Sequence, residues 1–128
     1  MNDSGKRPAT ATNTEPTSVD LRARARLNEG NRLVWSSQGE ELSVNLVAFA
    51  AGDGVAEHVN DEVEVLLVGV AGEGIVAVDG RQLVLRAGYS LIIPKGTRRL
   101  TRAVTDSFAY LTCHRRRAGL RPILSPSH

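Results

Sequence analysis

The chain has 128 residues, of which 41% are hydrophobic, so it has room for one domain with one core. No apolar run approaches the roughly 18 to 20 residues that a membrane-spanning helix needs, so we expect a soluble protein without a membrane partner. The polar N-terminus lacks the apolar stretch of a secretory signal, and the single cysteine, Cys113, cannot form an internal disulfide. Both features favour the cytoplasm, with Cys113 as a buried, inert thiol.

The net charge of +2 is distributed unevenly along the chain. Residues 28–114 contain eleven acidic and seven basic side chains, whereas the flanks contain three acidic and nine basic ones. The basic residues cluster at Arg22, Arg24 and Arg26 and in the run Arg115–Arg117. No aromatic residue is interleaved with either cluster, and no helix-turn-helix or zinc-finger spacing accompanies them. The sequence therefore does not favour a nucleic-acid partner, and the clusters are interpreted as solvated charge or as pairing with the acidic region 28–114.

In chain order, residues 1–18 have the composition of a disordered tail that deletion should leave without effect on the fold. Residues 19–41 are an extension with the first strand, 32–36, which a hairpin loop at 37–40 joins to a second strand, 42–49. We assign 42–116 to the main domain and 117–128 to a C-terminal tail. No segment has a helical period of useful length.

The remaining strands are short and are separated by turn residues. Asp79-Gly80 is the strongest hairpin signal, because both residues tolerate the positive φ angles of a type I′ turn. Pro94 and Gly96 mark a further turn. The predicted strands are 56–59, 63–70, 75–78, 82–85, 90–93, 98–104 and 108–114. About nine short strands at near-regular spacing predict an all-β fold, either an antiparallel sandwich or a closed barrel.

Two motifs within this region resemble those of the cupin family, which read G-x5-H-x-H-x3-E-x6-G and G-x5-P-x-G-x2-H-x3-N. The first is matched at Gly52, His58, Glu64 and Gly72, and the second at Gly88, Pro94 and Gly96. The resemblance covers about 42–114 and implies a double-stranded β-barrel of the jelly-roll type. In the family, three histidines and the glutamate hold a divalent metal such as iron, manganese, zinc or nickel in the barrel mouth.

Two of the four implied ligand positions hold other residue types. Asn60 stands at the second histidine position and Arg99 at the third, which leaves His58 and Glu64 as the matching metal ligands. Two ligands rarely hold a metal, and a guanidinium cannot coordinate one. We therefore expect a degenerate metal site with no tightly held cofactor, in which His58, Asn60, Glu64 and Arg99 line a ligand pocket.

Strand alternation places Arg99 toward the barrel, where it can pair with a buried Glu64 or hold a ligand anion in a bidentate fork. A one-residue shift would turn it outward. On the last strand, Ala109, Leu111 and Cys113 are expected to face the interior, and His114 is expected to face away. Trp35 and Phe49 are expected to pack in the core or an interface.

Three functions remain open at this point. The first is a metal-free module that binds a small polar or anionic molecule. The second is a metal-dependent cupin enzyme of the dioxygenase, isomerase or lyase type, with Asn60 or His114 as an added ligand. The third is a structural or regulatory dimer. A homodimer is expected in any case, because the strand at 63–70 is apolar on both faces, and small cupins commonly pair.

Overall fold

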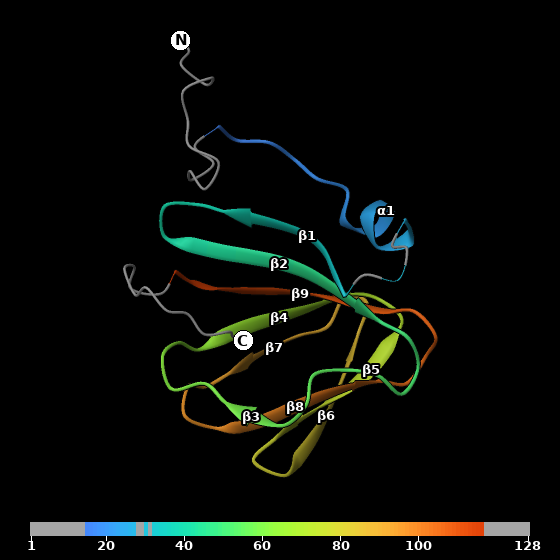
Figure 1. Cartoon of the computed structure of the whole chain (residues 1–128), viewed down its shortest axis with the longest axis vertical. Coiled ribbons are helices and arrows are strands. Elements are labelled where there is room, and N and C mark those ends of the chain that lie inside the picture. The colour runs from blue at the N-terminus through green and yellow to red at the C-terminus, as the bar shows by residue number, and fades with distance from the viewer. Residues whose placement is uncertain (1–14, 28–29, 31, 117–128) are drawn as a thin grey trace.

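The computed structural model describes residues 15–27, 30 and 32–116. Across these residues, nine antiparallel strands form a five-stranded sheet of order β1-β2-β9-β4-β7 and a four-stranded sheet of order β3-β8-β5-β6 (Figure 1). The strands are β1 (Leu33–Gln38), β2 (Leu42–Phe49), β3 (His58–Val59), β4 (Val65–Ala71), β5 (Glu73–Val78), β6 (Arg81–Arg86), β7 (Ser90–Ile93), β8 (Arg98–Ala103) and β9 (Phe108–Arg115). The predicted all-β cupin-like fold is confirmed, as two facing sheets that do not close into one continuous barrel.

The turns form where glycine and aspartate permit unusual backbone angles. Asp79 and Gly80 have φ angles of 50° and 84°, and they join Val78 to its register partner Arg81 as a two-residue hairpin. This is the turn that the Asp-Gly pair predicts. It fixes the register of β5 and β6, and β5 in turn pairs with β8, the strand that carries Arg99.

The main core lies between the two sheets. Phe108, Leu85, Val63 and Val76 are almost completely inaccessible to solvent there, and the Tyr110 ring packs against Phe108 with ring centroids 5.1 Å apart. Burying side chains of this size stabilises the fold by about 1.5 to 3 kcal/mol each. The predicted core role of Phe49 is confirmed, because Phe49 belongs to the same cluster.

A second, smaller core lies on the outer face of the five-stranded sheet, where a short helix, α1 (Leu21–Arg26), packs beside the β1–β2 hairpin (Figure 1). Asp20 caps the helix by accepting a hydrogen bond from the Ala23 amide at 3.0 Å. Leu21 and Ala25, one turn apart, cover the sheet. The buried residues beneath them are Leu46, Ala48, Val70 and Ala109, with Trp35 packed alongside. The expectation that no helix contributes was therefore wrong, whereas Trp35 packs as predicted.

Most of the two predicted tails lies outside the described residues. Of the N-terminal tail, residues 15–18 are described, and they are exposed and have no regular structure. At the other end, the Arg116 amide donates to the Glu41 carbonyl at 2.8 Å, so the pairing of β2 and β9 extends to the end of the described chain. No helix in the described part of the chain has the length and apolar character needed to cross a membrane.

Candidate functional site

A cavity of about 350 Å³ lies between the inner faces of the two sheets. Its apolar wall comes mainly from the five-stranded sheet and consists of Val47, Phe49, Val65, Leu67, Ile93 and Tyr110. Three of the four residues proposed from the sequence also line it: His58, Asn60 and Arg99. The cavity thus combines a broad apolar surface with a few polar groups, the usual composition of a small-molecule site.

Arg99 points into the cavity from β8 and is 5% exposed, so its predicted inward direction agrees with the structure. Its Nη2 donates to the Pro94 carbonyl at 3.1 Å and its Nε to the Thr97 carbonyl at 3.4 Å. Within the described residues no carboxylate lies within ion-pair distance of the guanidinium. Burial lowers the pKa of Arg99 from its ordinary value, yet a guanidinium remains protonated in proteins. The cavity therefore holds a positive charge without a balancing anion.

Asn60 is 7% exposed and also lines the cavity. Its Oδ1 accepts hydrogen bonds from the Glu62 and Val63 amides, at 2.9 and 3.3 Å. The main-chain carbonyl of Asn60 accepts a hydrogen bond from the Gly96 amide. This bond joins Asn60 to the turn at 94–97, whose carbonyls accept from Arg99. The two amide donors identify the oxygen of the side chain, so Nδ2 is the remaining donor, and it is buried without a partner among the described residues.

Glu64 does not line the cavity, contrary to its predicted position. Its neighbours Val63 and Val65 are buried and face inward, so the strand alternation turns Glu64 into solvent, where it is exposed. His58 and Glu64 also lie at strands of different sheets, rather than on paired neighbours as expected. A buried ion pair between Glu64 and Arg99 is therefore absent from the described residues.

The spacing between Glu64 and Gly72 in the first cupin motif already indicates that Glu64 is not at the glutamate position. Seven residues separate Glu64 from Gly72, whereas the family motif has six between its glutamate and its glycine. Counting back from Gly72 places the acidic position at Val65, which lines the cavity. The residue at the glutamate position is therefore apolar in this chain.

Two histidines line the cavity, from opposite sheets. The Nδ1 atom of His58 donates to the Ala56 carbonyl at 3.0 Å, and that of His114 to the Arg115 carbonyl at 2.9 Å, because a carbonyl can only accept. The inward direction of His114, which is 9% exposed, corrects the prediction that it faces away. Ala109 and Leu111 instead face the second core under α1, and half-buried Cys113 shares their face of the strand.

The side chains present do not fit the divalent metal that the cupin motifs imply. The described residues contain no group of three or more His, Cys, Asp or Glu side chains placed to hold a metal ion. His58 and His114 supply two imidazoles, the glutamate position holds valine, and Arg99 brings a fixed positive charge into the same cavity. Metal sites in proteins generally need at least three protein ligands, and a neighbouring cation opposes binding.

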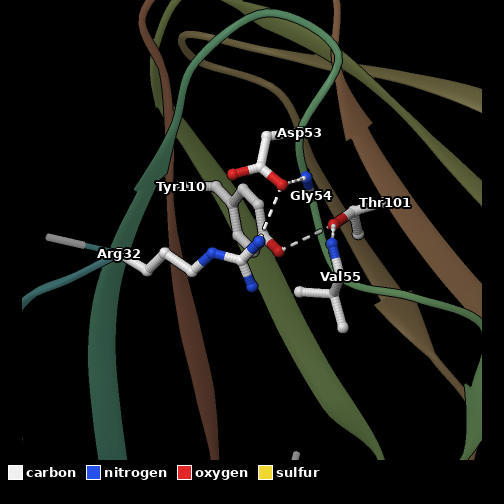
Figure 2. Close-up of polar contacts among 6 residues, drawn as sticks. All are labelled: Arg32, Asp53, Gly54, Val55, Thr101 and Tyr110. Atoms are coloured by element: carbon white, nitrogen blue, oxygen red, sulfur yellow. Dashed lines mark hydrogen bonds and ion pairs between the residues drawn. The ribbon is translucent and has the colours of Figure 1, made fainter. Parts of the chain in front are cut away.

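Polar contacts near Tyr110 join the two sheets at one side of the cavity (Figure 2). The Tyr110 hydroxyl lies 3.1 Å from the Thr101 hydroxyl, which also accepts from the Val55 amide at 3.1 Å. The exposed Arg32 guanidinium forms an ion pair with Asp53 at 2.7 Å. This pair ties the start of β1 to the loop between β2 and β3, so the cavity is bordered by a cation that already has an anionic partner.

Titration of Tyr110 is expected to be shifted far into the alkaline range. Burial raises the pKa of this phenol to about 12, although the hydrogen bond with Thr101 and the charge of Arg32 act in the opposite direction. The folded state thus binds the proton more tightly than the unfolded state, whose phenol has a pKa of about 10. The resulting stabilisation is complete below pH of about 10 and is lost as the pH rises to about 12. A Tyr89→Phe variant leaves Tyr110 as the sole tyrosine, so near-ultraviolet absorbance can follow the ionisation of this one phenol as the pH is raised. A titration midpoint at a pH of about 10 would contradict the raised pKa of Tyr110.

Comparison with known proteins agrees with this architecture. The family model described as "Cupin domain" matches residues 45–114, more than half of the chain. The chain belongs to the cupin family. No curated protein matches the sequence significantly.

Solved structures with the same cupin fold come from several bacteria. BH2720 from Bacillus halodurans has a TM-score of 0.68 at 19% identity, covering 84% of this chain and 86% of its own. TT1209 from Thermus thermophilus has a TM-score of 0.66 at 23% identity, with 79% and 98% covered. A cupin protein from Bacteroides fragilis is 26% identical, with a TM-score of 0.55 and coverage of 66% and 73%. At these identities the likeness describes the fold, and the chemistry rests on the cavity of this chain.

Proposed function

We propose that this cupin binds a small anionic molecule in its cavity, without a tightly held metal, and that Arg99 is the main contact. The observation that carries the proposal is a 5% exposed guanidinium with no carboxylate partner among the described residues. A buried charge without a partner costs several kcal/mol. A bound anion would remove that cost, so the cavity favours an anion over a neutral molecule of the same shape.

The hydrogen bonds already made by Arg99 leave room for a ligand. A guanidinium has five N–H groups, and two of those of Arg99 donate to backbone carbonyls, at Pro94 and Thr97. These two bonds hold the head group in place, and the other donors are available for a bidentate contact with carboxylate or phosphate oxygens. Asn60, which also lines the cavity, has a second donor, Nδ2, without a partner among the described residues. Two donors on residues that line one cavity favour a ligand group that only accepts.

Anion binding should depend on Arg99 and not on its neighbour Arg98, which is exposed and pairs with Glu57 at 3.5 Å. In isothermal titration calorimetry, we expect butanoate to bind the wild type and Arg98→Gln equally, and its neutral analogue butanamide to bind neither. Arg99→Gln should weaken butanoate binding about tenfold to a hundredfold, because a hydrogen bond to a charged group is lost. Unchanged binding of butanoate by Arg99→Gln would contradict the proposal.

A metal-dependent cupin enzyme is the second candidate, because His58 and His114 both line the cavity. Iron, manganese, zinc or nickel would then be the metal. Elemental analysis of the purified protein separates the two: stoichiometric metal that is lost in His58→Ala would support the enzyme and contradict metal-free binding.

We also propose that the protein forms a homodimer, for which a structural or regulatory role is a further alternative function. We propose the cytoplasm as its location. Support for a dimer comes from the outer face of the five-stranded sheet, where Leu66 and Val68 are half-buried and Ile92 on the edge strand β7 is exposed. The helix α1 covers one part of this face. A second copy of the chain would cover the rest.

A further inference from the structure

The charge balance of the cavity limits the charge of its ligand. Two arginines are among the described residues that line it, Arg32 and Arg99. Arg32 already pairs with Asp53 at 2.7 Å and also lies over the Phe49 ring, 5.2 Å from its centroid. Of these two arginines, Arg99 alone lacks an anionic partner within the described part of the chain. One uncompensated positive charge matches one negative charge, whereas a phosphate dianion would bring a second charge into a low-dielectric space without a partner.

The wall opposite Arg99 is apolar. Val65 takes the place of the family's glutamate there, and its register partner on β7 is Ile93, which is 2% exposed. Leu67 continues this surface two residues further along β4. The ring of Phe49 extends it and stacks on Tyr110 with ring centroids 6.0 Å apart. A ligand held at Arg99 therefore extends from the four-stranded sheet onto hydrocarbon of the five-stranded sheet.

We infer, on the basis of the proposed anion binding, that the ligand is a small monocarboxylate with an apolar body. The carboxylate contacts Arg99, and the hydrocarbon part packs on Val65, Leu67 and Ile93. Phosphate lacks the apolar body, and a hydroxyl-rich sugar acid would lose the hydration of its hydroxyl groups against this wall. The cavity volume of about 350 Å³ is near the lower end for small-molecule sites, which favours a compact ligand.

A series of linear carboxylates tests this inference in the wild-type protein. From acetate through propanoate and butanoate to pentanoate, affinity measured by calorimetry should rise about fourfold per added CH₂ group, the factor that corresponds to burial of one methylene. Inorganic phosphate and gluconate should bind more weakly than butanoate. A Val65→Thr variant, which keeps the shape of the side chain and adds a hydroxyl, should weaken pentanoate about fivefold and leave acetate unchanged.

The outcomes separate the ligand class from the proposed function. A flat carboxylate series, or phosphate or gluconate binding as tightly as butanoate or more tightly, overturns the apolar monocarboxylate; if that binding still depends on Arg99, the anion site itself stands. Failure of all these probes to bind overturns both proposals. If Val65→Thr does not fold, judged by its NMR spectrum, the wild-type series alone decides.

Discussion

The Gly72→Ala variant is expected to lose about 3 kcal/mol of unfolding free energy. Gly72 has a φ angle of 68°, a conformation that costs an L-residue roughly 1 to 2 kcal/mol. A methyl group there would also collide with the Ser107 carbonyl oxygen and the Thr105 hydroxyl. Because a backbone atom cannot move aside as a side chain can, overpacking adds about 1 to 3 kcal/mol.

Gly52→Ala is the matched control for this variant. Gly52 also has a positive φ angle, of 84°, but no atom of the described residues lies within 4 Å of the position that a Cβ would occupy. It should lose only the conformational part, about 1 kcal/mol. Urea unfolding curves measure both variants. Equal losses in the two would contradict the close approach of the Ser107 backbone to Gly72.

A metal site is expected to appear when three cavity residues are changed together. Asn60→His with Val65→Glu and Arg99→His would restore three histidines and a glutamate and remove the opposing charge. We expect zinc or nickel affinity about a hundredfold or more above that of the wild type by calorimetry. Asn60→His also removes the oxygen that accepts from the Glu62 and Val63 amides, so a loss of about 1 to 2 kcal/mol in stability should accompany it.

The double variant with Val65 retained tests the corrected position of the acidic residue. If the exposed Glu64 stays in solvent, Asn60→His with Arg99→His should bind metal much more weakly than the triple variant. Equal affinity of the two would show that Glu64 reaches the cavity, and the assignment of Val65 to the acidic position would then be wrong.

The strands and their turns could be predicted because their signals are local. Asp79-Gly80 determines its hairpin through its own backbone angles, and the alternation around Arg99 determines which way that side chain points. Glu64 was misplaced because its position was judged from the spacing to His58 alone. A turn lies between the two, whereas the count from Gly72 begins directly after β4 and runs back along that strand to Val65.

The direction of His114 could not be predicted from β9 alone, because this strand is covered on both faces. Tyr110 and His114 face the cavity, whereas Ala109 and Leu111 face the second core. Both faces look apolar in the sequence, so the pattern of one strand does not say which is which. A predicted helix over the outer face would have shown that Ala109 and Leu111 face it and that His114 faces the cavity. The six-residue helix α1 is too short to give a clear helical period in the sequence.

The strand order also determines when the cavity can form. In the five-stranded sheet, β1 and β2 alone are consecutive, and β9 lies between β2 and β4 with its partners far away in sequence. Such topologies close long loops before they gain contacts, and similar domains fold in milliseconds to seconds. Until β9 docks, β2 and β4 each have an unpaired edge, and Tyr110 and His114 are missing from the cavity wall. During synthesis, the cavity therefore lacks part of its wall for as long as β9 is still inside the ribosome.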